Sequence, residues 1–422
     1  MALPELIEIL PLDQPVRAEI TVPGSKSITN RALILAALSH GQTILPGALW
    51  SEDTQVMADG LRKLGFIVNV ADDPQEPCNR VITVHGKGGA VPPGGTPERP
   101  LELFVGNAGT AARFLAALVC LGQGVYRLHG VPRMHERPQA ALFDALRELG
   151  YRVESPNDRL PVLIHGGGAR AAKCRVSIAE SSQFASALLL GADAGQWRVE
   201  VSGENAEESP YVVMTRKLIT AFPRSGGRFQ VEPDASSASY FLGAGFLVSG
   251  SAVTIRAAPA TDWQVDAAFA RFLPLPASVS RQTDLGDSIM TAVVLAPFGR
   301  QAVRFADLGR LRVQECERVL ALRTELTKCG ARVVEESDTL TVYPSPLHGA
   351  AIETYNDHRM AMCAAILGLK VPGIKLKNPS CVKKTFPNFF QKLATPPPDG
   401  LGARILDEKN GRVLSRAELF AE

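Results

Sequence analysis

The 422-residue sequence has no long apolar run, and none approaches the roughly 20 residues that a membrane-spanning helix needs. Its first fifteen residues, MALPELIEILPLDQP, carry three acidic side chains and lack the basic start and the apolar core of a signal peptide. The net charge is only +2, which excludes the broad basic surface typical of a nucleic-acid-binding protein. We therefore expect a cytoplasmic protein that has neither a membrane nor a nucleic acid as partner.

Cysteine and histidine are both scarce and scattered. The seven cysteines never form a CxxC pair, and the seven histidines show no HExxH or other ligand spacing. An odd number of separated cysteines is typical of buried thiols in a reducing compartment, and it argues against a disulfide framework or structural zinc. We expect no metal site and no organic cofactor.

One pattern recurs six times along the chain: an Ala/Leu-rich helix, a glycine turn and a short β-like run. With 45% hydrophobic and 21% charged residues, the chain can fold as two or more globular domains. The spacing of roughly fifty to eighty residues exceeds that of most solenoid repeats, so each copy is a larger α+β unit. Three copies precede residue 232 and three follow it, which predicts two α/β (α+β) domains of three repeats each. The copies lie at 32–45, 111–130, 184–203, 239–257, 289–306 and 359–378.

The first copy is preceded by PGSKSITNR (23–31), the most informative segment for function. Lys26 and Arg31 stand at the expected start of a helix, where unpaired N–H groups and the helix dipole favour an anion. With the neighbouring hydroxyls they form a site for a small molecule that carries phosphate and carboxylate groups. An ATP-binding P-loop is excluded, because Ser25 separates Gly24 from the lysine and breaks the order that this motif requires.

A polar segment also precedes the helix in each of the other five copies, and loops at helix starts often carry binding groups. Ser, Asp, Asn and Thr are the favoured N-cap residues, so we expect most of these polar side chains to cap their helices. Five side chains exceed what capping needs and are better candidates for binding or catalysis: Lys26, Arg31, Gln183, His358 and Arg359.

Nine motifs, spread over roughly residues 15–392, resemble those of 5-enolpyruvylshikimate-3-phosphate (EPSP) synthases in their order and approximate spacing. The resemblance implies a two-domain inverse α/β barrel, each domain being three βαβαββ-like units around a pseudo-threefold axis. It places one domain at 21–232 and the other at 1–20 plus 233–394, and it leaves 395–422 as a C-terminal extension of unknown role. The motifs are PGSKSITNRAL, GNAGTAAR, PRMHERP, SSQF, DASSASYF, GDSIMT, RVQECER, NDHRMAM and KTFPNFF.

The activity that the resemblance implies is transfer of the carboxyvinyl group of phosphoenolpyruvate to the 5-hydroxyl of shikimate 3-phosphate, with release of phosphate. This step belongs to the shikimate pathway that leads to chorismate and the aromatic amino acids. Both substrates are polyanions, which accounts for local clusters of cations in a nearly neutral protein. The resemblance also implies that glyphosate inhibits by occupying the phosphoenolpyruvate pocket, and we expect a monomer.

The resemblance further implies roles for individual residues. Asp287 would be the base at the 5-hydroxyl and Glu315 the proton partner at the phosphoenolpyruvate methylene, with Lys26 taking part and His358 close by. The contacts to shikimate 3-phosphate would be Lys26, Ser27, Arg31, Ser181, Ser182, Gln183, Ser209, Asp287, Arg310 and Gln314. The contacts to phosphoenolpyruvate would be Lys26, Gly109, Arg133, Gln183, Arg318, Arg359 and Lys384.

The chain departs from the family pattern at several positions. Gln314 stands where the family has Lys, and loss of a charge-assisted hydrogen bond costs about 1–3 kcal/mol. Arg310 precedes it by four residues on an expected strand, so it would share its face, and we hypothesise that it replaces the missing cation. The family's Ser-x-Pro-Tyr pattern is imperfect at 207–213, so the phosphate-binding serine is Ser209 or is absent. Phe114 stands where some relatives have Pro, beside the glyphosate pocket.

Two alternative functions stay open. The sister family, which transfers enolpyruvate to UDP-N-acetylglucosamine, usually carries a reactive cysteine in a mobile loop, whereas Cys120 lies in an expected apolar helix. A non-catalytic or weakly active paralogue that binds shikimate 3-phosphate is suggested only by Gln314. Retention of the expected lysines, carboxylates and histidine together argues against such a loss of activity.

Overall fold

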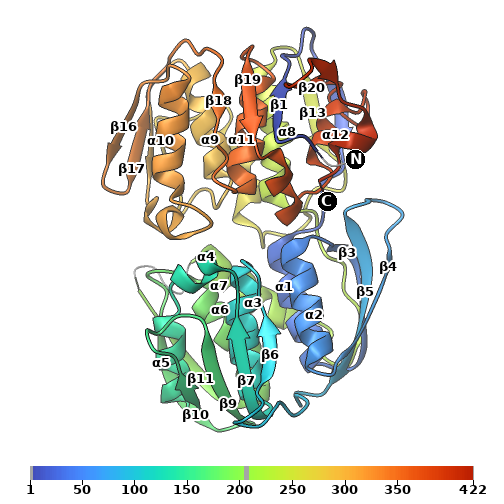
Figure 1. Ribbon diagram of the computed structural model, residues 1–422, viewed down its shortest axis with the longest axis vertical. Helices are drawn as coiled ribbons and strands as arrows, with labels where there is room; N and C mark the ends of the chain where they lie inside the picture. The colour runs from blue at the N-terminus through green and yellow to red at the C-terminus, as the bar shows by residue number, and fades with distance from the viewer. Residues whose placement is uncertain (1–2, 204–208, 422) are drawn as a thin grey trace. The chain divides into compact units, whose positions relative to one another are not determined.

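The computed structural model describes residues 3–203 and 209–421 of the chain. They form two compact units: unit 1 is Met1–Pro23 with Pro233–Glu422, and unit 2 is Gly24–Glu232 (Figure 1). The chain therefore starts in unit 1, builds all of unit 2, and returns to complete unit 1. Among the described residues, no helix is both long and apolar enough to cross a bilayer.

Unit 2 contains three parallel strand pairs, and one helix packs against each pair. Strand β12 pairs with β3, β6 with β7, and β10 with β11. The helices α1, α3 and α6 contact one another, and every residue of α3 is buried. A helix that is apolar on all sides, such as GTAARFLAALVC, is stable only inside a core. The elements are α1 (Lys26–Leu38), β3 (His40–Leu49), α2 (Glu52–Lys63), β4 (Ile67–Asp72), β5 (Asn79–Lys87), β6 (Leu101–Phe104), α3 (Gly109–Cys120), β7 (Gln123–His129), α4 (Pro132–Glu136), α5 (Ala140–Glu148), β8 (Arg152–Glu154), β9 (Val162–Gly167), β10 (Ala172–Ser177), α6 (Gln183–Gly195), β11 (Trp197–Ser202), α7 (Pro210–Ala221) and β12 (Gly227–Arg228).

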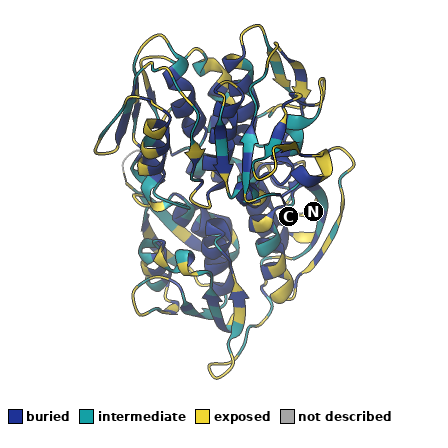
Figure 2. Ribbon diagram, turned by 45° about the horizontal axis from the view of Figure 1, so that its top comes forward, coloured by how far each residue is buried: buried dark blue, intermediate teal, exposed yellow. Residues whose placement is uncertain are grey.

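Unit 1 repeats this plan. Its parallel pairs are β2 with β13, β14 with β15, and β18 with β19, and its mutually contacting helices are α8, α9 and α11. Within each unit the mutually contacting helices are mostly buried, and exposed residues lie on the other helices, the strands and the loops (Figure 2). The elements are β1 (Leu6–Ile9), β2 (Arg17–Ile20), α8 (Ala235–Leu247), β13 (Ala252–Ile255), η1 (Val265–Phe272), β14 (Ser278–Ser280), α9 (Ile289–Leu295), η2 (Ala296–Phe298), β15 (Val303–Ala306), η3 (Gly309–Val313), α10 (Arg318–Lys328), β16 (Val333–Glu336), β17 (Thr339–Val342), β18 (Ala351–Ile352), α11 (His358–Gly368), β19 (Ile374–Lys377), η4 (Pro379–Lys384), α12 (Phe389–Ala394), β20 (Ile405–Asp407), β21 (Arg412–Val413) and η5 (Arg416–Leu419).

The C-terminal segment 395–422, expected as an extension beyond the second domain, is part of unit 1. Its strand β20 pairs antiparallel with β1, and β21 continues the same five-stranded sheet. Its apolar side chains, including Leu401, Ile405 and Leu419, are buried in the core of this unit. The segment therefore completes a sheet edge and stabilises the unit that holds it.

Two local expectations are wrong. Among the described residues at the starts of the six repeat helices, the N-cap residues that accept a side-chain capping bond are Asp234, from Ser237 N (2.7 Å), and Asp357, from Arg359 N (2.8 Å). The N-cap residues of α1, α3, α6 and α9, all of them described, make no side-chain capping bond. The run that contains Arg310 is the 3-10 helix η3 and not a strand, because Asp307, with φ 61°, turns the chain after β15.

Candidate active site

In unit 2, the first turns of α1, α3 and α6 meet. Asn30 Nδ2 donates to Thr110 Oγ1 over 2.7 Å, which joins α1 to α3. Arg31 Nη2 donates to Ser186 Oγ over 2.9 Å, which joins α1 to α6. Three converging helix N-termini present unpaired N–H groups and a positive partial charge, so this place favours an anion.

Lys26 begins α1 and is held by a carboxylate that the sequence motifs do not include. Its Nζ lies 3.0 Å from Asp53 Oδ2, and the Asp53 side chain is only 4% exposed. Asp53 belongs to the first turn of α2, so it comes from a different element from the motif at 23–31. The pair keeps the ammonium at the helix start while the Lys26 side chain stays 17% exposed and within reach of a ligand.

Arg31, expected as a substrate contact, uses most of its N–H groups for hydrogen bonds within unit 2. Its Nε donates to Thr215 Oγ1 (2.8 Å) and its Nη1 to Ser27 O (2.9 Å), in addition to the Ser186 bond. Three of the five N–H groups of this guanidinium are therefore used within unit 2. Burial lowers the pKa of Arg31 to about 10. Its first role is to tie α1 to α6 and α7.

Gly109, the first residue of α3, makes room for two guanidinium groups. A Cβ there would lie 2.6 Å from Arg113 Nη1, 2.7 Å from Arg137 Nη2 and 3.1 Å from Gln183 Oε1. The structure thus brings Gly109, Gln183 and two arginines together. Arg133 is not among these three nearest side chains; its Nη1 pairs with Glu136 over 2.7 Å, and its side chain is 39% exposed.

The serines expected to hold a phosphate lie at two helix starts of unit 2. Ser182 precedes α6 and is buried, and Ser181 Oγ accepts from Gln183 N over 3.2 Å. Ser209 precedes α7 and is 5% exposed, and its Oγ has no hydrogen-bond partner among the described residues. A buried hydroxyl of this kind suits a polar ligand. Residues 207–208 of the imperfect motif lie outside the described residues.

In unit 1, Asp287 lies between two arginines. Arg281 Nη2 is 2.9 Å from Asp287 Oδ1, and Arg359 Nη2 is 3.1 Å from Asp287 Oδ2. Burial raises the pKa of Asp287, but the charges of Arg359, Arg281 and Arg318 outweigh this effect and hold that pKa well below its usual range. Asp287 is therefore a carboxylate at neutral pH, and its basicity depends on what else the arginines bind.

A second carboxylate, Asp266, supports the turn that carries Asp287. Its Oδ1 accepts from Gly286 N (2.8 Å) and Ser288 N (3.1 Å), the N–H groups on either side of Asp287. Ser288 Oγ donates to the same oxygen, and Ser236 Oγ donates to Oδ2 over 3.1 Å. Burial raises the pKa of Asp266, and the hydrogen bond from Ser288 opposes that rise. No sequence motif indicated this residue.

Glu315 lies against two cations of the predicted set. Its carboxylate is 2.9 Å from Arg318 Nη2 and 3.3 Å from Lys384 Nζ. Arg318 also binds Asp357 through Nε (2.7 Å) and Nη2 (3.2 Å), and both of these side chains are almost completely buried. Burial lowers the pKa of Arg318, but the charges of Asp357 and Glu315 raise that pKa by more than burial lowers it. The guanidinium therefore stays charged.

The remaining predicted residues of unit 1 lie next to this cluster. His358 is buried at the start of α11, and its Nδ1 is 3.7 Å from Asp357 Oδ1. Gln314 Oε1 accepts a hydrogen bond from Arg318 Nη1, so the amide is drawn towards the cluster. Arg310 lies in η3. Burial lowers its pKa, and the nearby charge of Arg281 lowers it to a smaller extent.

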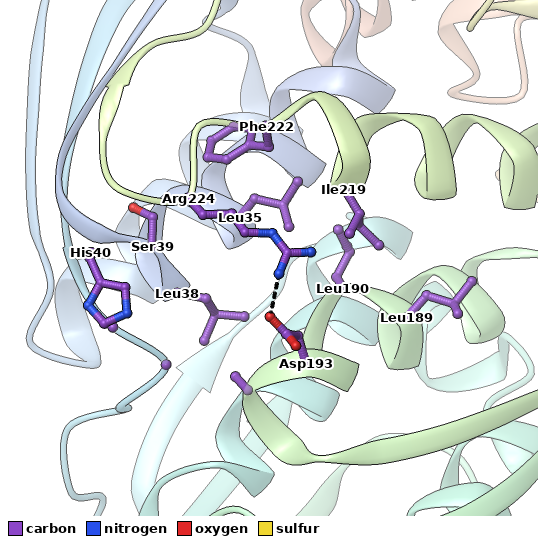
Figure 3. Close-up of a pocket in the computed structure, with 13 residues that line it drawn as sticks. Leu35, Leu38, Ser39, His40, Leu189, Leu190, Asp193, Ile219, Phe222 and Arg224 are labelled. Carbon is purple, nitrogen blue, oxygen red and sulfur yellow. Dashed lines mark hydrogen bonds and ion pairs between the residues drawn. The ribbon is translucent and has the colours of Figure 1, made fainter.

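The cavity drawn in Figure 3 is separate from these residues. It has a volume of about 390 Å³ and lies in unit 2, at the C-terminal ends of α1 and α6, where Leu35, Leu38 and Leu190 line it. Arg224 and Asp193 pair across it over 2.8 Å. The helix starts with Lys26 and Gln183 are at the opposite ends of the same helices. Among the described residues, no three His, Cys, Asp or Glu side chains are placed to hold a metal ion.

Known proteins match the chain along most of its length. The sequence model of the family described as EPSP synthase (3-phosphoshikimate 1-carboxyvinyltransferase) matches residues 12–284 and 274–393. The 3-phosphoshikimate 1-carboxyvinyltransferase of Opitutus terrae is 38% identical, with 94% of this chain and 98% of the relative covered. That of Trichormus variabilis is 37% identical, with 92% and 98% covered.

Solved structures agree on the fold. EPSP synthase from Acinetobacter baumannii has a TM-score of 0.73 at 21% identity, with 95% of this chain and all of that chain covered. The enolpyruvyl transferase NikO from Streptomyces tendae has a TM-score of 0.68 at 16% identity, with 98% and 100% covered. The predicted two-domain α/β fold is confirmed, and the chain belongs to the EPSP synthase family.

Proposed function

We propose that this protein transfers the carboxyvinyl group of phosphoenolpyruvate to the 5-hydroxyl of shikimate 3-phosphate and releases phosphate. Its relatives over almost the whole length are named 3-phosphoshikimate 1-carboxyvinyltransferases. The observation that carries the proposal is Asp287, a carboxylate that is 15% exposed and has an arginine on each oxygen. Such a site offers a base next to cations that bind polyanionic substrates.

In unit 1, Asp287 would accept the proton of the 5-hydroxyl as that oxygen attacks C2 of phosphoenolpyruvate. Glu315, held by Arg318 and Lys384, would donate a proton to the methylene carbon, which becomes a methyl group. In the second step the methyl group would give a proton back to Glu315, and the double bond forms again as phosphate leaves. Arg318, Arg359 and Lys384 supply positive charge for the carboxylate and phosphate of phosphoenolpyruvate. Anions that engage the arginines weaken their hold on Asp287, which raises its pKa towards that of a useful base.

In unit 2, Lys26, Ser27, Ser181, Ser182, Gln183 and Ser209 remain the proposed contacts of the substrates, joined by Arg31 through its remaining N–H groups. The orphan hydroxyl of Ser209 supports its assignment to the phosphate of shikimate 3-phosphate. For phosphoenolpyruvate we propose Arg137 in place of Arg133, because Arg137 Nη2 lies against Gly109. Asp53 would act by positioning Lys26.

Product analysis separates this function from its alternatives. The protein is incubated with phosphoenolpyruvate and either shikimate 3-phosphate or UDP-N-acetylglucosamine, and products are identified by mass spectrometry. We expect a carboxyvinyl product only from shikimate 3-phosphate. Buried Cys120, whose pKa burial raises, is poorly suited to the reactive role of the sister family. Product from UDP-N-acetylglucosamine, or binding of shikimate 3-phosphate without any product, would contradict the proposal.

The finer expectations belong to the same proposal. Glyphosate would compete with phosphoenolpyruvate at the cations around Gly109, and the protein would act as a cytoplasmic monomer without a cofactor. Competitive inhibition against phosphoenolpyruvate is the test of the first, and sedimentation equilibrium of the oligomeric state. An inhibitor effect that is absent at millimolar glyphosate would contradict the first.

A further inference from the structure

Arg281 is a buried cation outside the family motifs. Its side chain is 8% exposed, and its Nη2 donates to Asp287 Oδ1 over 2.9 Å. Its Nε is buried and has no hydrogen-bond partner within the described ranges 3–203 and 209–421. A buried donor is normally satisfied, so this guanidinium is built to bind something more than Asp287.

Backbone pairing brings Arg310 to the same edge of the sheet. Strands β14 and β15 are parallel and end together, and Arg281 N donates to Ala306 O over 3.1 Å. The left-handed turn at Asp307 then leads into η3, which carries Arg310. The charge of Arg281 contributes to the lowered pKa of Arg310, after burial. The two positive charges therefore repel each other, and an anion bound by both guanidinium groups would offset that repulsion.

Asp287 divides the cations of unit 1 into two groups. Arg281 contacts Oδ1 of Asp287, whereas Arg359 contacts Oδ2. The charge of Arg318 also acts on Asp287, and we group Arg318 with Arg359. A base in this position suits a reaction with one anion on each side of it. The Arg359 side is already proposed for phosphoenolpyruvate. The other side is therefore available to the acceptor, whose phosphate sits two ring carbons from the reacting hydroxyl.

We propose that Arg281 and Arg310 form the subsite of unit 1 for the 3-phosphate of shikimate 3-phosphate, and that Arg281 supplies the charge missing at Gln314. The inference rests on the proposed function. Gln314 cannot take this role as placed, because its Oε1 accepts from Arg318 Nη1 and so the amide turns to the phosphoenolpyruvate side. Arg281 extends the hypothesis that Arg310 alone replaces the cation, and two guanidiniums match a phosphate dianion better than one.

The test compares two ligands that differ only in the phosphate. Dissociation constants of shikimate 3-phosphate and shikimate are measured by calorimetry for the wild type, Arg281→Gln and Arg281→Lys. We expect Arg281→Gln to weaken shikimate 3-phosphate about tenfold or more and shikimate less than about twofold, with partial recovery in Arg281→Lys. The matched control is Arg304→Gln on β15, an exposed arginine bonded to Thr339 Oγ1 (3.3 Å), which should leave both constants unchanged.

The ratio of the two constants isolates the phosphate from other effects. If Arg281 acted only on Asp287, both ligands would weaken equally and the ratio would stay constant, which would overturn the inference. If Arg281→Gln does not fold, Arg310→Gln is measured in the same way, and an unchanged ratio there overturns it as well. Failure of the proposed function looks different: the wild type itself would form no product, or would bind shikimate as tightly as its phosphate.

Discussion

Asp266 offers a sharp test of how the fold positions Asp287. In Asp266→Ala, the buried donors Gly286 N, Ser288 N, Ser288 Oγ and Ser236 Oγ lose their acceptor. Each unsatisfied donor costs about 1–3 kcal/mol, which gives roughly 4–12 kcal/mol. Removal of a buried carboxylate returns part of this, since burial disfavours its charge. We expect a net loss of about 3–5 kcal/mol in the free energy of unfolding, and at most about 2 kcal/mol for Asp266→Asn, which keeps an acceptor oxygen.

The assays are urea unfolding, hydrogen exchange of the α9 peptides, and steady-state kinetics. Because a neutral amide oxygen holds the N–H groups on both sides of Asp287 less firmly than a carboxylate does, we expect Asp266→Asn to lower kcat about tenfold or more with little change in either KM. Asp284→Ala is the matched control: it lies on the same segment, is half-buried where Asp266 is buried, and accepts hydrogen bonds from Ser280 N and Thr283 Oγ1. A loss below about 1 kcal/mol in Asp266→Ala, with kcat unchanged in both variants, would refute the reasoning.

Three further predictions follow from the same contacts. Gly109→Ala should raise KM for phosphoenolpyruvate about tenfold or more in steady-state kinetics, because its Cβ would displace Arg113 and Arg137, while KM for shikimate 3-phosphate stays nearly constant; equal changes in both would contradict it. Asp357→Ala should lower the free energy of urea unfolding by about 3–5 kcal/mol, because Arg318 loses a buried bidentate partner; a loss under about 1 kcal/mol would count against it. Asp287 has a depressed pKa, so its stabilising contribution is complete above the unfolded value of about 3.9 and is lost as the pH falls towards the folded value. The stability difference between wild type and Asp287→Asn should therefore shrink as urea unfolding is repeated from about pH 5 downwards, and a constant difference would be inconsistent with that linkage.

The repeats and the helix starts that carry most of the proposed site residues could be predicted from the sequence, because both depend on local patterns. An Ala/Leu-rich helix that is apolar all round must be buried, and a polar segment before it lies at a helix start. The helix-start motif at 23–31 then proposed Lys26, and the family resemblance proposed Asp287 and Glu315. Helix capping was over-predicted because a cap residue can be used elsewhere: Ser288 Oγ, for example, donates to Asp266.

The residues that sequence reasoning missed are set by tertiary contacts. Asp53 and Asp266 come from segments without a motif, and packing alone brings them to Lys26 and to the Asp287 turn. Arg133 and Arg137 share one motif, and only the end of α4 distinguishes them. The helix stops at Glu136, and Arg137 has extended backbone angles, with φ −74° and ψ 144°, that accompany its approach to Gly109.

The central claim is that this chain, with Gln314 in place of the family lysine, is a working carboxyvinyl transferase. The most direct measurement is phosphate release after mixing the purified protein with phosphoenolpyruvate and shikimate 3-phosphate, with each substrate omitted in turn. We predict release that requires both substrates and stops in Asp287→Asn. A folded wild-type protein that binds shikimate 3-phosphate and releases no phosphate would contradict it.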